Sequence, residues 1–144
     1  MYYNVYTEPT DEAVGFTAQA SFGSSFYNIS DLVIFNSTVS NIGGYYQTSS
    51  SQFLCPADGM YAFSFSIRTP SGYAFEGAMM KESALLGAVA CDNMDGFSNG
   101  VSNLAIAICS KGERVWIRCT TDADAVYNNS NGYTTFSGFL LNRL

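Results

Sequence analysis

Short segments in which apolar and polar positions alternate run along most of the chain. The clearest spans Met60 to Arg68, and its larger apolar residues occupy every second position: Tyr61, Phe63, Phe65 and Ile67. Successive side chains of a strand point to opposite faces, so this alternation predicts a strand with one face in a core. Turns are predicted at its two ends, at Cys55 to Gly59 and at Thr69 to Gly72, because Pro, Asp and Gly favour chain reversal.

Similar segments predict further strands, separated by clusters of Gly, Asn, Ser, Asp and Pro. They are Gly15 to Ala20, Leu32 to Phe35, Tyr45 to Gln47, Gln52 to Cys55, Phe75 to Lys81, Leu85 to Ala90, Leu104 to Cys109, Arg114 to Thr120 and Thr134 to Asn142. About ten short strands without a helical period predict an all-β sandwich. Long loops are predicted at Cys91 to Asn103 and at Asp122 to Gly132, and a tight hairpin at Ser110 to Glu113.

Chain length and charge refine this picture. A chain of 144 residues suits one domain, which we place at residues 14–144, after an N-terminal tail or linker at residues 1–13. Charged residues make up 12% of the chain, about half the usual share, while aromatic residues make up 15%. So little charge does not cover a small monomer. The composition therefore predicts a surface rich in Ser, Thr, Asn and Gly, with part of the aromatic surface covered by another copy of the chain.

Several classes of function are excluded by what the sequence lacks. The net charge is −6 and the six basic residues are scattered, which argues against a nucleic-acid partner. No apolar stretch approaches the ~20 residues that a bilayer-spanning helix needs. The chain has no histidine, and no pair of carboxylates is spaced for acid and base catalysis. We therefore predict a protein that is not an enzyme and does not insert into membranes.

The cysteines and glycosylation sequons leave alternatives open. The four cysteines are Cys55, Cys91, Cys109 and Cys119. They show no C-x-x-C spacing, and without histidine a mixed zinc site is excluded, so bridges and buried thiols both remain. Three sequons begin at Asn28, Asn36 and Asn128. They would permit glycosylation in a secretory pathway, although a chain rich in Asn, Ser and Thr contains some by chance. The N-terminal segment has no signal-peptide pattern, which decides little about secretion.

Acidic and amide residues gather in the first predicted loop. Asp92, Asn93, Asp95 and Asn99 offer the oxygen ligands that calcium prefers. Their spacing does not match a contiguous calcium-binding loop, so a site here would combine separate loops. Solvated loop charge is the alternative interpretation.

Aromatic and glycine positions recur in a fixed order along the chain. The segments are GFTA at 15–18, VIFN at 33–36, NIGGYY at 41–46, FLCPADGMYAFSF at 53–65, KGERVWI at 111–117 and TFSGFLL at 135–141. In order and spacing they resemble the globular head of the complement C1q family over residues 14–142. The chain departs from that family in lacking a collagen-like stalk, in Glu113 where Asp is usual, and in Cys109 where an aliphatic residue is common.

The resemblance implies a fold and a class of function. It implies a ten-stranded jelly-roll sandwich of two antiparallel sheets, related to tumour necrosis factor, that forms a homotrimer. Such domains are recognition proteins, so we expect a secreted, extracellular innate-immune protein or lectin that binds microbial glycans as a multivalent trimer. The alternatives are a secreted signalling or synaptic-organiser ligand that binds a protein receptor, and a trimerisation module of a longer chain.

The resemblance also directs attention to two loops. Tyrosine faces suit sugar rings and amides suit hydroxyls, so the expected ligand-binding residues are Tyr127, Asn128, Asn129 and Tyr133. Calcium is the candidate cofactor. Asp92 matches an acidic ligand position of relatives, the second such position falls near the uncharged Asn99, and Asp95 would compensate.

Overall fold

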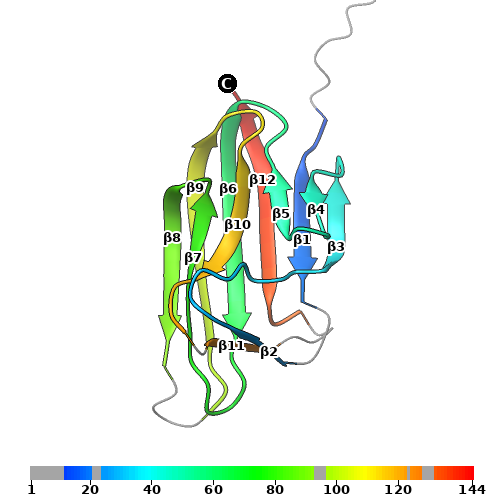
Figure 1. Cartoon of the computed structure of the whole chain (residues 1–144). Coiled ribbons are helices and arrows are strands. Elements are labelled where there is room, and N and C mark those ends of the chain that lie inside the picture. The colour runs from blue at the N-terminus through cyan, green and yellow to red at the C-terminus, as the bar shows by residue number, and fades with distance from the viewer. Residues whose placement is uncertain (1–11, 21–23, 93–96, 123, 128–131) are drawn as a thin grey trace, which may run out of the picture.

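The computed structural model describes residues 12–20, 24–92, 97–122, 124–127 and 132–144 (Figure 1). Twelve strands and no helix occur in these residues, so nothing described is a helix that could cross a bilayer. The strands are β1 (Gly15–Gln19), β2 (Ser24–Tyr27), β3 (Ser37–Ile42), β4 (Tyr46–Gln47), β5 (Gln52–Leu54), β6 (Gly59–Arg68), β7 (Phe75–Lys81), β8 (Ala84–Cys91), β9 (Gly100–Cys109), β10 (Arg114–Cys119), β11 (Asp124–Tyr127) and β12 (Thr135–Arg143). The tail expected at residues 1–13 falls mostly outside the described residues and stays a prediction.

Two antiparallel five-stranded sheets pack face to face. Sheet one has the order β3-β1-β12-β6-β9 and sheet two the order β4-β5-β10-β7-β8. The two-stranded pair β2 and β11 lies at one end of the sandwich (Figure 1). The predicted jelly roll of two antiparallel sheets is confirmed, with β2 and β11 as an addition.

Some boundaries differ from the predictions. Leu32 to Phe35 is not a strand: Leu32 makes only an isolated bridge to Arg118, while Val33 and Phe35 are buried beside sheet two. The alternation of apolar residues therefore reflects the burial of Val33 and Phe35 in a segment that is not a strand. β3 was not predicted, because an edge strand with the sequence STVSNI needs few apolar residues. β9 begins at Gly100 and β11 lies inside the second predicted loop, so both predicted loops were too long.

Aromatic rings fill the space between the sheets. Phe16 is almost fully buried, and three rings lie within 5 Å of its ring centre: Tyr46 at 4.8 Å, Phe53 at 4.9 Å and Phe136 at 4.9 Å. Two rings stack and the third meets Phe16 edge-on, which are the preferred aromatic geometries. Gly138 permits this packing, because a Cβ there would lie 2.5 Å from Phe63 and 2.9 Å from Phe16.

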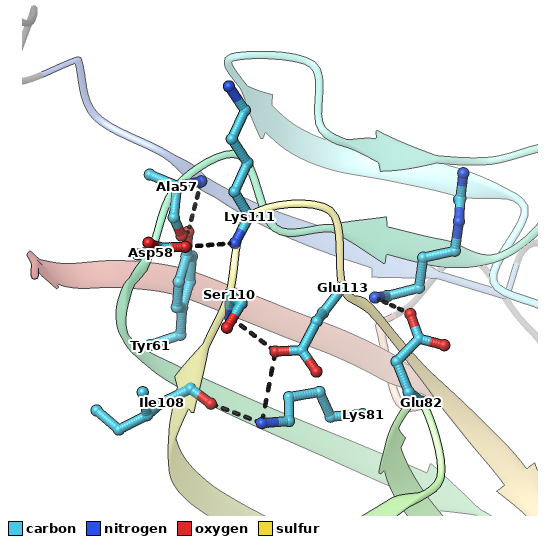
Figure 2. Close-up of polar contacts among 10 residues, drawn as sticks. Ala57, Asp58, Tyr61, Lys81, Glu82, Ile108, Ser110, Lys111 and Glu113 are labelled. Carbon is cyan, nitrogen blue, oxygen red and sulfur yellow. Dashed lines mark hydrogen bonds and ion pairs between the residues drawn. The ribbon is translucent and has the colours of Figure 1, made fainter.

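Both termini of the described chain lie at one end of the sandwich, which we call the termini end (Figure 1). A guanidinium nitrogen of Arg143 donates to the carbonyl of Glu12 at 3.1 Å. Polar contacts hold the turns there (Figure 2): the Lys111 amide donates to Asp58 at 2.8 Å, and Lys81 Nζ lies 3.7 Å from Glu113. The opposite end carries β2, β11 and the longer loops, and we call it the loop end.

All four cysteines lie in the described residues and are present as thiols. Cys55 and Cys109 are buried together near the termini end: Cys55 follows β5 of sheet two, and Cys109 is the last residue of β9 of sheet one. A hydrogen bond with Cys109, together with burial, raises the pKa of the Cys55 thiol. Of the two alternatives left open by the sequence, the structure has buried thiols at these positions.

Tyr61 predicts how stability depends on alkaline pH. Its hydroxyl donates to the Ala57 carbonyl at 2.7 Å, and burial raises its pKa from 10.0 to about 12 (Figure 2). The folded state therefore holds this proton more tightly than the unfolded state. The free energy of unfolding should be at its full value below about pH 10 and fall toward pH 12, by about 1.4 kcal/mol per unit of pKa difference.

Urea unfolding at a series of pH values would measure this slope. Burial raises the pKa of Tyr46 as well, so Tyr61→Phe should reduce the slope without removing it. A free energy of unfolding that stays constant through this pH range would contradict the prediction.

Candidate functional site

The outer face of sheet one carries an apolar row near the termini end. Residues in register on neighbouring strands point to the same face of a sheet. The row runs from β3 to β9 through Ile42, Gly15, Phe139, Ala62 and Ile106. Its three large side chains are each about half exposed. Ile108, which is equally exposed, lies in the adjacent row on the side of the termini end. The two small residues between them keep the face shallow. We call this the apolar row.

Hydroxyl groups replace apolar side chains toward the loop end of the same face. On the loop-end side of the apolar row, the first row holds Thr17, Ser137, Ser64 and, as an apolar exception, Leu104. The second row holds Gln19, Thr135, Ser66 and Ser102. Thr17 and Ser137 share a hydrogen bond of 2.8 Å between their hydroxyls. A shallow hollow of about 540 Å³ lies among Ser64, Ser66, Ser102 and Thr135. None of these rows carries a charged side chain.

This face is suited to self-association. A contiguous apolar row across the outer face of a sheet is unusual on a soluble monomer and marks an interaction surface. The hydroxyl-bearing rows beside it carry no charge, so covering them with another copy does not require a charged group to lose its water. The sequence did contain a signal for it: Leu104 to Cys109 is apolar at both even and odd positions, whereas a half-buried strand alternates.

Asn99 organises the loop between β8 and β9 at the loop end. Its side-chain amide donates to the carbonyls of Asp92 at 3.2 Å and Phe97 at 3.3 Å. Its backbone pairs with Thr69, through N–H···O distances of 2.7 Å to the Asn99 carbonyl and 3.2 Å to the Thr69 hydroxyl. The described ends of the loop are therefore joined to each other, and Asn99 is fixed to the turn that follows β6.

The described part of this loop does not make a calcium site by itself. Asp92 is exposed and contributes one carboxylate, and Asn99, whose side-chain nitrogen donates to two carbonyls, has only its side-chain oxygen to offer. Across the described residues no group of three or more acidic, cysteine or histidine side chains is placed to hold a metal. Asp95 lies outside the described residues, so calcium at Asp92, Asp95 and Asn99 stays a prediction.

Tyr133 is an exposed ring held in place at the loop end. The Arg68 guanidinium lies 4.2 Å from the ring centre, and Arg68 Nε donates to Ser98 Oγ at 2.9 Å. Arg68 at the end of β6 is therefore joined to Tyr133 by a cation–π contact and to the β8–β9 loop by a hydrogen bond. Sequence reasoning chose Tyr133 but missed Arg68, which the pattern marked only as the last residue of a strand.

The other expected ligand-binding residues are only partly described. Tyr127 is the last residue of β11, and its side chain is outside the described part. Asn128 and Asn129 also lie outside it. The joint role of the four residues in binding therefore stays a prediction.

Comparison with known sequences gives a consistent result. The profile of the C1q domain matches residues 15–141. Caprin-2 of Danio rerio is 31% identical over 134 residues, which cover 92% of this chain and 14% of that protein. Human complement C1q tumor necrosis factor-related protein 3 is 29% identical over 126 residues, which cover 85% of this chain and 49% of that protein. The chain thus spans half or less of the length of these curated relatives.

Solved structures share the fold. The globular domain of zebrafish complement 1qA protein has a TM-score of 0.75 at 23% identity, covering 91% of this chain and 99% of that one. Eiger TNF from S. frugiperda has a TM-score of 0.75 at 9% identity, covering 92% and 95%. At these identities the likeness concerns the fold alone.

Proposed function

Since this chain belongs to the C1q-domain family, we propose that it is a secreted recognition protein that acts as a homotrimer and binds microbial glycans through its loop end. Domains of the C1q and TNF-like type form trimers and serve as ligands or recognition domains. We extend this role to the chain and assign it no catalytic activity. The domain match covers residues 15–141 and so spans both five-stranded sheets apart from the last residues of β12.

The observation that carries the proposal is the apolar row on sheet one. Ile42, Phe139 and Ile106 are exposed in the single chain, and a second copy would cover them. Association on this face leaves the loop end, with Tyr133 and the β8–β9 loop, directed away from the termini. Three copies would present three loop ends together, and several weak sites then act with higher avidity than one.

Tyr133 supports a sugar as the ligand. An exposed tyrosine face suits the apolar side of a pyranose, and the contact with Arg68 fixes the ring before binding. The Arg68 guanidinium also places hydrogen-bond donors beside the ring, close to where sugar hydroxyls would lie. Preorganisation of this kind reduces the cost of ordering side chains on binding.

Tyr133→Ala is expected to weaken glycan binding while the trimer stays intact. Loss of a stacking contact worth about 0.5–1.5 kcal/mol at each of three sites should reduce avidity at least about ten-fold on a glycan array. Tyr127→Ala should act in the same direction. Ile34→Ala is the control, because Ile34 is a similarly exposed apolar side chain that belongs to none of the proposed sugar contacts. Unchanged binding in both the Tyr127 and Tyr133 variants would place the site elsewhere.

A protein receptor is the second candidate partner. The similarity to a complement C1q tumor necrosis factor-related protein favours it. The same glycan array separates the two functions: binding to particular sugars that free monosaccharide competes away supports the lectin. A trimer that binds no glycan but binds cell-surface protein would support the receptor ligand.

A further inference from the structure

The turn that follows β2 presents Asn28 in a fixed position. The backbone N–H of Asp31 donates to the backbone carbonyl of Asn28 at 3.1 Å, and the backbone N–H of Asn28 donates to Asp31 Oδ2 at 2.8 Å. The next amide, of Ile29, donates to Asp122 Oδ1 at 2.8 Å. Ser30 adopts a positive φ of 72° and donates to the Cys119 carbonyl at 2.9 Å. The backbone of residues 28–31 is therefore anchored at every step.

The side chains of this turn point to solvent. Asn28, Ile29 and Ser30 are all exposed, and within the described residues no hydrogen bond reaches the Asn28 side-chain amide. Asn28, Ile29 and Ser30 form an Asn-x-Ser sequon. N-linked glycosylation requires the side-chain amide of Asn28 and the hydroxyl of Ser30, and both groups are therefore accessible.

An aromatic pair lies beside Asn28. Phe26, two residues earlier, is 63% exposed, and Tyr73 is 42% exposed. Their ring centres are 5.4 Å apart at 67°, an edge-to-face contact at the surface. Residues two apart in an extended segment point to the same side, and Tyr27 between them turns inward to accept the Ile34 amide at 3.1 Å. Phe26 and Asn28 therefore share the outer side.

The other sequons are less well placed. Asn36 is half-buried before β3, and its sequon continues into the strand. It also has an interaction partner within the chain. Asn128 lies outside the described residues. Among the described sequons, only the one at Asn28 combines an anchored turn with exposed side chains.

We propose that Asn28 carries an N-linked glycan whose first sugar packs against Phe26 and Tyr73. The inference rests on the proposed secretion, because the donor, a lipid diphosphate-linked oligosaccharide, is found in the secretory pathway. In the transfer, the bond between sugar C1 and the diphosphate oxygen breaks and a bond from C1 to Asn28 Nδ2 forms. Nδ2 gives up one proton and the lipid diphosphate leaves.

Packing of the sugar would cover an apolar patch that is otherwise exposed to solvent. Phe26, Tyr73 and Ile29 together expose apolar surface at the loop end. The apolar side of an N-acetylglucosamine ring would pack on the exposed surface of these two rings. β2 belongs to neither five-stranded sheet, so a glycan here leaves the apolar row of sheet one open for association.

The occupancy test uses the chain secreted from insect cells behind a cleavable leader. Peptide mass spectrometry after amidase treatment, which converts a glycosylated Asn to Asp, should find Asn28 modified in most molecules. Asn28→Gln and Ser30→Ala should each remove that glycan mass, and the matched control Asn36→Gln should keep it. An unmodified Asn28 in folded, secreted protein would overturn the inference.

The packing test compares melting temperatures before and after glycan removal. Loss of the glycan should lower the melting temperature of the wild type by about 3 °C and leave that of Phe26→Ala unchanged. Equal shifts in the two proteins would overturn the contact with Phe26. The oligomeric state is measured separately on unglycosylated protein from bacteria. A trimer there with Asn28 unmodified in insect cells defeats only this inference, while a monomer with Asn28 modified defeats only the proposed function.

Discussion

A carboxylate placed in the apolar row should convert the proposed trimer into monomers. In Ile106→Asp the new charge would be buried against a neighbouring copy without a partner, which costs several kcal/mol at each interface. Because the trimer contains this contact three times, its association constant should fall by many orders of magnitude. Ile106 is 54% exposed in the single chain, so the fold itself should be kept. Sedimentation velocity at micromolar concentration measures the change in mass.

Ile34→Asp is the matched control. Ile34 is 51% exposed, much like Ile106, but lies in the segment before β3 and outside sheet one. If exposed apolar surface in general drove association, both variants would dissociate, whereas the apolar row requires that only Ile106→Asp does so. A wild type that sediments as a monomer, or an Ile106→Asp variant that stays trimeric, would contradict the assignment of this face.

Phe16→Ala should have the largest effect on folding. The substitution removes a ring that contacts Tyr46, Phe53 and Phe136 in the core, and such truncations cost about 3–5 kcal/mol. That is a large fraction of the stability of a domain of this size. Urea unfolding should be measured in the Ile106→Asp background, because unfolding of a monomer does not depend on protein concentration.

Phe97→Ala provides the reference for the core variant. Phe97 has the same ring but is 70% exposed in the β8–β9 loop, so its truncation should change the free energy of unfolding by less than about 0.5 kcal/mol. If the two variants lost similar stability, Phe16 would not be the centre of the core that the ring geometry indicates.

Prediction from sequence succeeded where a strand has one buried face. The alternation of Met60 to Arg68 matches β6, whose Tyr61, Phe63 and Phe65 are fully buried. It failed at Leu32 to Phe35, where the same alternation belongs to a lone segment with a single bridge. Alternation reports which side chains are buried, while strand pairing depends on neighbours that are distant in sequence.

The candidate site was harder to predict for a related reason. The apolar row joins Gly15 to Phe139 and Ala62 to Ile106, and such register between distant strands is not visible in any single segment. The aromatic pair of Phe26 and Tyr73 likewise joins β2 to the turn after β6. Tyr133 and Asp92 could be chosen as candidates because exposed loop residues are selected by chemistry alone, and their roles in binding stay predictions.

The bond from Arg143 to the Glu12 carbonyl places the entry and exit of the domain side by side. A domain whose termini lie close together can be joined to another sequence at either terminus. It can also be inserted whole into a loop of another protein. The loop end would then lie at the side of the domain away from that protein. Relatives in which a matching segment occupies from 14% to about half of the protein are what such a portable unit would produce.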